Sequence, residues 1–257
     1  MKEISKLIPD SLKQDTSTHQ TTKTIPSRYN DKSVEEIEKE EKATAAPSGS
    51  KKGYDFDECA VFLNKKGKEQ FGKHFEINPA DYEIIFKLLV FAIKDTANAT
   101  KFNINLGKGI LLSGPVGCGK TTLMTLLNHF QPQPNRHIMK SCREVSFEFI
   151  QDGYETIHKY SKNSFNRKGE ETTPRIYCFD DLGTENNLKY YGNECNVMAE
   201  ILLSRYDLFV QKKMLTHITT NLSATEIENM YGSRVRSRMR EMLNLISFDR
   251  NTPDKRL

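Results

Sequence analysis

A short glycine-rich stretch, 114-GPVGCGKTT-122, limits the possible folds of this chain more than any other feature. It overlaps the end of the apolar run 109-GILLSG-114 and opens the helical stretch 120-KTTLMTLLNHF-130. The spacing matches G-x-x-x-x-G-K-[ST], the Walker A pattern, in which glycines let backbone N–H groups converge on a phosphate at the start of a helix. The sequence therefore predicts a buried strand, a phosphate-binding loop and a helix in direct succession.

The residue types in this loop each suit one part of a nucleotide. The Lys120 ammonium is expected to reach the β- and γ-phosphates, and the Thr121 hydroxyl is expected to hold Mg²⁺. A glycine turn with an unrelated lysine is the structural alternative. The predicted cofactors are ATP and Mg²⁺. The residues predicted to bind them are Gly114, Pro115, Val116, Gly117, Cys118, Gly119, Lys120, Thr121 and Thr122.

A second acidic motif follows another predicted strand. The run 175-RIYCFD-180 leads directly into Asp181, which is the Walker B form of apolar residues followed by an acid. Asp180 is expected to hold Mg²⁺, directly or through water. Asp181 is expected to activate the water that attacks the γ-phosphate, and a paired acid favours hydrolysis over binding alone. Glu185 is a weaker candidate, for which a solvated loop position is the simpler interpretation.

A polar amide follows the strand candidate 214-MLTHITT-220. Asn221 is placed to orient the attacking water or to sense the γ-phosphate. A turn or a helix cap is the alternative. Ser223 and Glu226 already supply the capping box of the next helix, however, which leaves Asn221 available for another task.

The alternation of predicted strands and helices indicates an α/β fold, with a mainly parallel five-stranded sheet flanked by helices. The Walker A pattern makes this a fold of the P-loop NTPase type. Helices are expected at 79–95, 120–130 and 194–213. Strands are expected at 109–114, 136–141, 175–180, 214–220 and 244–248.

The first part of the chain differs in composition from the rest. Residues 1–52 are rich in Ser, Thr, Lys and Glu and poor in large apolar side chains, so they cannot bury enough apolar surface to offset the entropy of ordering. We expect a disordered tail, in which 33-SVEEIEKEEKA-43 and the spaced apolar residues of 4–12 are candidate segments for docking on a partner. A solvated linker is the alternative. Residues 53–257 are expected to form one ATPase domain.

The overall composition excludes several classes of protein. The net charge of +4 permits nucleic-acid binding without requiring it. Five cysteines with no CxxC spacing favour reduced thiols over a disulfide framework or a zinc site. No apolar run approaches the roughly 20 residues of a membrane span, and the N-terminus lacks the apolar core of a signal peptide. A cytoplasmic location with no membrane partner is expected.

The order of these motifs resembles the AAA+ ATPases of the DnaC/IstB group, which contains bacterial replicative-helicase loaders and transposition helper ATPases. The resemblance covers about residues 105–250 and rests on five segments: GPVGCGKTTL, YCFDDLGTE, SRYDLF, THITTNLS and YGSRVRSRMRE. It implies an AAA+ fold with Asn221 as sensor 1. It also implies that ATP lies between subunits and that the chain forms a homo-oligomer, an open ring or spiral around single-stranded DNA.

The arginine-rich segment 231-YGSRVRSRMRE-241 acquires a role from this resemblance. The family pattern places at Arg238 the arginine that touches the γ-phosphate bound by the next subunit, with Arg234 as a neighbouring candidate. Gly232 is expected to break the helix that starts at Ser223. Beyond it, Val235, Met239 and Met242 should form the buried side of a second helix.

Two departures from the family pattern are visible. The chain ends soon after the last predicted strand, so the helical lid of many AAA+ proteins is expected to be truncated or absent. Arg250 and Arg256 are possible replacements for the second sensor arginine of such a lid. The tail shows no match to the partner-binding domains of better-known members, so the resemblance identifies no partner.

A separate stretch predicts contact with nucleic acid. In 154-YETIHKYSKNSFNRKGEE-171, aromatic residues that can stack on bases alternate with cations that can follow phosphates. An amphipathic helix with buried aromatic residues, followed by a loop, is the alternative. Phe165 is the residue hardest to explain as core. The candidate contacts are Tyr160, Lys162, Phe165, Arg167 and Lys168.

These features together predict an ATP-hydrolysing DNA-replication protein of the helicase-loader kind, with a replicative helicase as partner. A transposition helper ATPase, with a transposase as partner, is the nearest alternative. A P-loop kinase fits less well, because the Asp180–Asp181 pair and the long segment after Asn221 count against it. A non-hydrolysing ATP switch is a third class.

Overall fold

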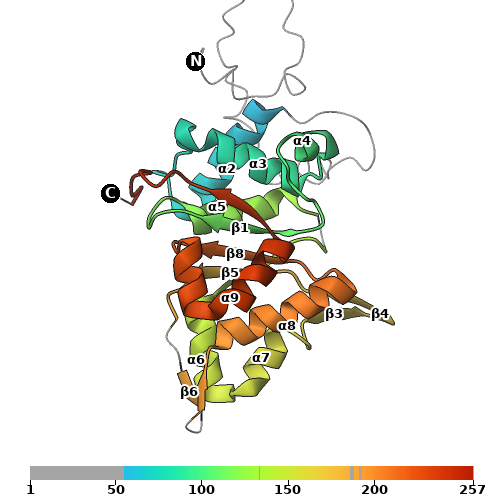
Figure 1. Ribbon diagram of the computed structural model, residues 1–257. Coiled ribbons are helices and arrows are strands. Elements are labelled where there is room, and N and C mark those ends of the chain that lie inside the picture. Colours follow the sequence, from blue (N-terminus) through green and yellow to red (C-terminus); the bar gives the residue numbers. More distant parts are fainter. Residues whose placement is uncertain (1–54, 133, 186–187, 191–192, 257) are drawn as a thin grey trace, which may run out of the picture. The chain divides into compact units, whose positions relative to one another are not determined.

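The computed structural model describes residues 55–132, 134–185, 188–190 and 193–256 (Figure 1). The chain divides into two compact units, residues 1–65 and residues 66–257, and the boundary falls inside helix α2 (Phe56–Phe71). The predicted tail, residues 1–52, lies outside the described residues. Its proposed docking segments therefore stay a prediction, and the features below all belong to the second unit.

A five-stranded sheet forms the centre of the second unit, with the strand order β2-β5-β8-β1-β9. Every neighbouring pair in it is parallel, so the predicted mainly parallel sheet is confirmed, and it is parallel throughout. Parallel strands bring their carboxyl ends to one edge, where α/β proteins bind ligands. The strands are β1 (Gly109–Ser113), β2 (Ile138–Ser141), β5 (Tyr177–Leu182), β8 (Thr216–Thr220) and β9 (Leu243–Ser247).

Helices cover both faces of this sheet (Figure 1). One face packs against four helices whose apolar side chains share a single buried cluster with β5 and β8: α6 (Cys142–Asp152), α7 (Tyr154–Tyr160), α8 (Val197–Lys212) and α9 (Ala224–Met242). The opposite side carries α3 (Tyr82–Ala92), α4 (Thr96–Lys101) and α5 (Lys120–Leu127), with short 3₁₀ turns at Pro79–Asp81 and Asn128–Phe130. All residues of β8 are buried, as expected for a central strand covered on both faces. In the described ranges, no helix is long and apolar enough to cross a bilayer.

Helix α9 has the start and the break that its sequence predicts. The Ser223 side chain accepts a hydrogen bond from the Glu226 N–H, and the Glu226 carboxylate accepts one from the Ser223 N–H, which completes the capping box. Gly232 interrupts the helix with φ 87° and ψ 159°. Beyond this kink, Val235 and Met239 are buried, so the arginines between them point toward the surface or its margin.

The segment after α7 is ordered, contrary to the alternative of a loop. It forms an antiparallel hairpin of β3 (Phe165–Lys168) and β4 (Glu171–Pro174), with Gly169 in the left-handed region at the turn (φ 63°). The Arg175 N–H donates to the Ser164 carbonyl at 2.9 Å and closes the base of the hairpin. A second small hairpin joins β6 (Leu188–Tyr190) to β7 (Asn193–Cys195).

A buried arginine on α8 connects the hairpin, the sheet and the helical layer. Arg205 is 0 % exposed, and burial lowers its pKa to about 9, so that the guanidinium stays protonated at neutral pH. Its hydrogen bonds reach the carbonyls of Tyr160 (2.8 Å), Leu215 (2.8 Å) and Arg175 (3.1 Å) and two hydroxyls, Thr216 Oγ1 (2.7 Å) and Ser164 Oγ (3.4 Å). All of these partners are neutral oxygens, so the charge is solvated by peptide and hydroxyl dipoles in place of water.

We predict that Arg205→Met lowers the free energy of unfolding by about 3–5 kcal/mol, because it leaves several buried carbonyls without a donor. Arg205→Lys should recover only part of this loss, since one ammonium cannot reproduce the planar fork of donors. Urea denaturation of the full chain measures both effects. Arg234→Met, at an exposed position of α9, is the control and should change stability by less than about 0.5 kcal/mol. A loss below about 1 kcal/mol for Arg205→Met would contradict this account.

Candidate nucleotide-binding site

The loop between β1 and α5 has the backbone of a phosphate-binding loop. Gly117 (φ 78°) and Gly119 (φ 103°) both adopt left-handed conformations, which are unfavourable for any residue that carries a Cβ. Lys120 is 6 % exposed, and its Nζ donates to the carbonyls of Gly114 and Pro115, each at 2.9 Å. The ammonium therefore lies within the curl of the loop, and its contact with the β- and γ-phosphates stays a prediction.

Two further residues of the loop differ sharply in exposure. Cys118 is fully buried, and burial raises the pKa of its thiol, so the thiol stays protonated and packs as an apolar group. Val116 is 56 % exposed and lines the cavity over the loop. Gly114 is required for packing, because a Cβ there would lie 2.7 Å from the Phe248 Cβ.

The two predicted metal ligands meet across the sheet edge. The Thr121 hydroxyl lies 3.0 Å from both carboxylate oxygens of Asp180, although the two residues come from α5 and β5. Burial is the largest influence on Asp180 and raises the pKa of its carboxyl, against the hydrogen bond from Thr219, which lowers it. A hydroxyl and a carboxylate are the oxygen ligands that Mg²⁺ takes, so this pair fits the ion that a Walker A loop implies.

Strand β5 contains an irregularity at its two acids, Asp180 and Asp181. Phe179 pairs with Ile218 and Leu182 pairs with Thr220, so that Asp180 and Asp181 together lie opposite one residue, Thr219. Such a bulge re-aims side chains and is common beside active sites. Asp181 adopts a left-handed conformation (φ 55°), and of the two acids it is Asp181 that lines the cavity over the phosphate loop.

Thr219 is a site residue that the sequence reasoning missed. Its hydroxyl donates to Asp180 Oδ1 at 2.7 Å and accepts from the Asp181 N–H at 2.9 Å. The side chain is 0 % exposed, so this position is fixed. The available signal was a threonine at the end of a predicted strand, in the segment TTN that also contains Asn221.

A cavity of about 560 Å³ opens over the phosphate loop. It brings together the predicted Lys120, Thr121, Asp181 and Asn221, and it extends to residues before α3 and after β9. Its walls are Phe71, His74, Phe75, Glu76, Ile77, Asp81, Val116, Gly117, Cys118, Gly119, Lys120, Thr121, Thr122, Leu123, Asp181, Thr184, Asn221, Lys255 and Arg256. This arrangement can hold an anion at the loop and place a carboxylate and an amide beside it.

Glu185 does not occupy the solvated loop position that we expected. It is 6 % exposed and accepts hydrogen bonds from the Gly183 N–H at 2.9 Å and from the Tyr231 hydroxyl. Tyr231 is itself 7 % exposed. The pair joins the loop after β5 to α9, so the role of Glu185 is structural.

The arginines of α9 have separate surroundings. Arg238 stacks on the Tyr206 ring (4.3 Å to the centroid) and donates to Tyr206 Oη (3.0 Å) and Glu241 Oε1 (3.1 Å), while its side chain stays 37 % exposed. It is not among the residues that line the nucleotide cavity. Arg236 pairs with Glu228 at 2.5 Å. The possible second-sensor residues also separate, because Arg256 lines the nucleotide cavity and Arg250 lines a different one.

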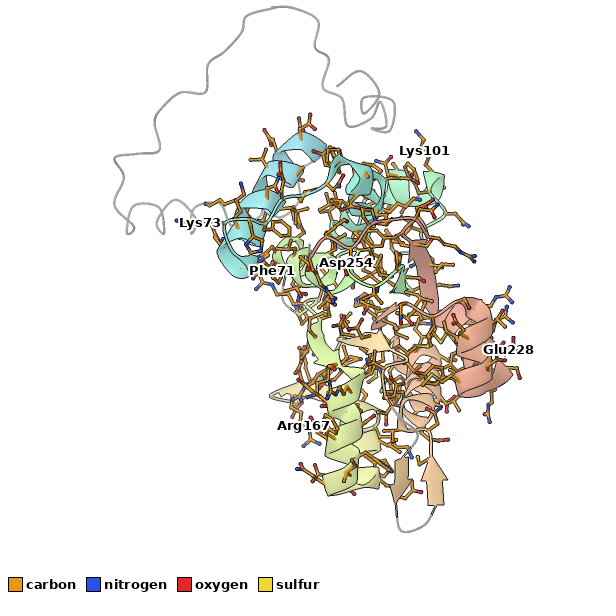
Figure 2. All side chains as sticks on the ribbon, turned by 90° about the vertical axis from the view of Figure 1, so that its left-hand side faces the viewer. Phe71, Lys73, Lys101, Arg167, Glu228 and Asp254 are labelled. Atoms are coloured by element: carbon orange, nitrogen blue, oxygen red, sulfur yellow. The ribbon has the colours of Figure 1, made fainter. Side chains whose placement is uncertain are left out.

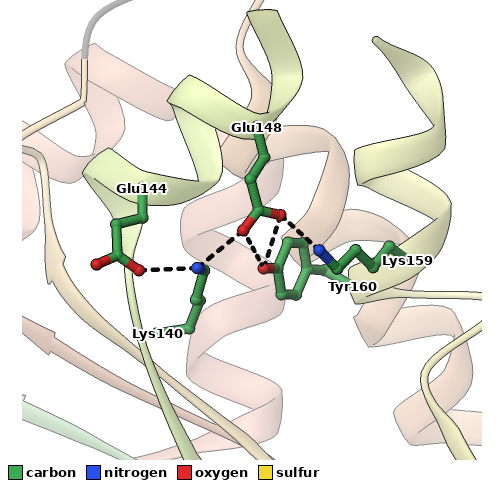
Figure 3. A network of polar contacts seen from close by, with 5 residues as sticks. All are labelled: Lys140, Glu144, Glu148, Lys159 and Tyr160. Carbon is green, nitrogen blue, oxygen red and sulfur yellow. Dashed lines mark hydrogen bonds and ion pairs between the residues drawn. The ribbon is translucent and has the colours of Figure 1, made fainter. Parts of the chain in front are cut away.

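The predicted nucleic-acid residues do not form one surface. Tyr160 is 2 % exposed, its ring packs against Tyr177 (5.2 Å), and its hydroxyl lies 2.9 Å from Glu148. Glu148 also pairs with Lys140 and Lys159 in the network shown in Figure 3. No face of the Tyr160 ring is available for stacking on a base, so Tyr160 belongs to the core.

The remaining candidates lie around the β3–β4 hairpin and next to α7. Phe165 and Arg167 line a shallow cavity of about 330 Å³ together with Lys212 at the end of α8. Lys162 lines a different cavity, of about 370 Å³, with Tyr154 and His158. Lys168 ends β3, and its side chain lies outside the described part of the structure.

Comparison with known proteins finds similar chains among solved structures. No family model matches the chain, and no curated protein matches it. Among solved structures, the DnaC helicase loader has a TM-score of 0.47 at 20 % identity, over 68 % of this chain and 94 % of the other. DnaI has a TM-score of 0.41 at 21 % identity, over 62 % and 85 %. AMPPCP-bound DnaA from Aquifex aeolicus has 0.42 at 17 %, over 68 % and 48 %. With identities of 17–21 % and TM-scores below 0.5, these neighbours establish no family, activity or partner for this chain.

We predict that Thr219→Val slows any Mg²⁺-dependent ATP turnover by roughly 10- to 100-fold, because both acids lose the hydroxyl that positions them. Stability should fall by only about 1 kcal/mol, the value of a typical hydrogen bond. Steady-state phosphate release and thermal unfolding measure the two effects. Thr156→Val is the matched control, since Thr156 is also fully buried and its hydroxyl has no hydrogen-bond partner among the described residues. Equal turnover of Thr219→Val and wild type would show that the acids are positioned in another way.

Proposed function

We propose that this chain is a Mg²⁺-dependent ATPase that assembles on single-stranded DNA and acts in DNA replication as a helicase-loader-like protein. The observation that carries the proposal is the meeting of Thr121 and Asp180 at 3.0 Å beside the Lys120 loop. A phosphate loop alone supports binding. The added Asp181 and Asn221 in the same cavity favour hydrolysis.

Each part of the hydrolysis reaction is assigned to particular residues of this chain. The loop N–H groups and Lys120 would bind the phosphates, and Thr121 and Asp180 would hold Mg²⁺. When bound, the ion supplies charge neutralisation at the phosphate oxygens. Asp181 would accept a proton from the attacking water, and Asn221 would orient that water. Thr219 would keep the two carboxylates in their separate positions.

The cation expected at the γ-phosphate would come from a second copy of the chain. Arg238 does not line the cavity of its own subunit, and its guanidinium is partly exposed on α9. A head-to-tail assembly would bring this face of α9 to the cavity of the neighbour. Tyr206 and Glu241 would hold the arginine extended for that contact.

DNA contact is proposed for the β3–β4 hairpin. Phe165, Arg167 and Lys212 line one cavity, which combines an aromatic ring with two cations in the way that single strands are bound. Lys162 and Lys168 are proposed as additional cations near this site. A replicative helicase is the proposed protein partner, and a transposase is the alternative, because the two kinds of ATPase share this core and differ in what they deliver.

A mixing assay tests the ATPase and the trans-acting arginine together. Arg238→Ala and Asp181→Ala should each reduce phosphate release by roughly 10³-fold or more, measured without an added acceptor and with single-stranded DNA present. Mixing the two variants should restore activity, because about a quarter of head-to-tail junctions would then join an intact arginine to an intact Asp181.

The control for this assay is Arg236→Ala. It removes a neighbouring arginine that pairs with Glu228 and should keep wild-type turnover. Absent recovery in the mixture, combined with normal activity of Arg238→Ala alone, would refute the role of Arg238. Phosphate transfer that requires an added acceptor would support a kinase in place of an ATPase.

Substitutions in the hairpin should separate stacking from charge in DNA binding. Phe165→Ala should weaken binding of single-stranded oligonucleotides by about 1–3 kcal/mol with an unchanged salt dependence. Arg167→Ala should reduce the slope of log K against log salt by about 0.7, the value of one phosphate contact. Fluorescence anisotropy over a salt series measures both. Lys101→Ala, an exposed position on α4, is the control, and equal effects of all three substitutions would contradict a site at the hairpin (Figure 2).

A further inference from the structure

The segment after β9 lies against the phosphate loop, and its Lys255 lines the nucleotide cavity. The Phe248 N–H donates to the Ser113 carbonyl at 2.8 Å, and seven residues later the Lys255 N–H donates to the Gly117 carbonyl at 3.1 Å. The Lys255 ammonium donates to the next carbonyl of the loop, that of Cys118, at 2.7 Å. One residue from outside the Walker A motif therefore holds two consecutive carbonyls of the loop.

The Lys255 ammonium is itself held from two further sides. It forms an ion pair with Asp81, which is 6 % exposed at the start of α3, and it lies 5.1 Å from the centroid of the Phe248 ring. The side chain of Lys255 is 25 % exposed, so solvent screens this pair only in part. Asp81 thus fixes the ammonium at the point where it meets the Cys118 carbonyl.

Holding these carbonyls constrains the anion-binding face of the loop. A peptide unit is planar and trans, so its N–H points opposite to its C=O. When Lys255 holds the Gly117 and Cys118 carbonyls, the N–H groups of Cys118 and Gly119 point away from these two contacts. Donors that are fixed before an anion arrives lose less entropy when it binds.

Asp254, next to Lys255, also approaches the loop closely at Gly117. The Asp254 carboxylate lies so close to Gly117 that a Cβ there would be 2.0 Å from Asp254 Oδ1. Figure 2 shows Asp254 on the same side of this unit as Phe71, which lines the nucleotide cavity. The close approach indicates that the segment and the loop form one packed structure.

We propose that Lys255 is a positioning residue of the nucleotide site, which keeps the phosphate loop in its anion-binding form and depends on Asp81 to do so. This proposal rests on the proposed binding of ATP at the loop. It gives the segment 249–256 a role in affinity, and the residue that provides it is Lys255, next to the Arg256 considered from sequence. Because linkage is reciprocal, a nucleotide that binds the ordered loop also stabilises the contact with Lys255.

The test compares a variant that removes the Lys255 charge with a variant that removes only its ion-pair partner, Asp81. Lys255→Met should weaken ATP binding by roughly tenfold or more, since it removes the charge-assisted hydrogen bond to the Cys118 carbonyl. Asp81→Leu keeps the ammonium but releases it, and it should weaken binding to a similar extent. The double variant should be no weaker than the stronger single variant, because both changes break one contact. Lys255→Arg should recover part of the affinity.

Lys87→Met is the matched control. It removes the ion pair of Lys87 with Glu83 on the same helix α3, and neither residue is among those that line the nucleotide cavity. Its affinity for ATP should equal that of wild type. Thermal unfolding without nucleotide, measured for every variant, separates a loss of affinity from a loss of folding.

Hydrogen exchange supplies a readout that does not depend on substitution. Added ATP should slow exchange of the Lys255 amide in the wild-type protein, because that amide donates to Gly117. Unchanged exchange, or wild-type affinity of Lys255→Met, would overturn the proposal. Normal affinity of Asp81→Leu beside weak binding by Lys255→Met would assign the effect to charge alone and would also overturn it. Failure of the wild-type protein to bind ATP would instead contradict the proposed function.

Discussion

The buried guanidinium of Arg205 is the interaction on which the arrangement of this unit depends. It is a fully buried cation. Carbonyls at the end of α7, just before β5 and just before β8 take the place of water around it. A displaced element would leave both the charge and a carbonyl unsatisfied, so Arg205 selects one relative position of helix, hairpin and sheet. Because it bonds Thr216 at the start of β8, it also fixes the position of the strand that carries Thr219 near its other end.

That register matters because the chemistry lies at the far end of the same strand. The bulge in β5 places two acids opposite Thr219, and one hydroxyl then serves both of them, as donor to Asp180 and acceptor for the Asp181 N–H. Burial raises the pKa of the Asp180 carboxyl, and the neighbouring charge of Asp181 raises it further. A site of this kind gains from a cation, which is the electrostatic reason that Thr121 and Asp180 suit Mg²⁺.

Local patterns in the sequence predicted most of what is local in the structure. The five sheet strands lie within about two residues of their predicted ranges, because short apolar runs between turns reflect burial directly. The capping box and the break at Gly232 are equally local. Tyr160 and Glu185 were misjudged for the opposite reason. Their burial is decided by partners distant in sequence, Glu148 with Tyr177 in one case and Tyr231 in the other, and no periodicity reports those contacts.

The same limit explains why the sequence pointed to Arg238 but not to Lys255. Arg238 was found through a motif, although it does not line the cavity of its own subunit. Lys255 has no motif, and only the folded chain brings it to Asp81 and to the Cys118 carbonyl. If both proposals hold, the first cation comes from a neighbour and the second from the chain itself. Binding and turnover would then be separable, because Lys255 would prepare the loop in a single subunit while Arg238 would act only after assembly. An isolated subunit would hold ATP, and hydrolysis would wait for the next copy.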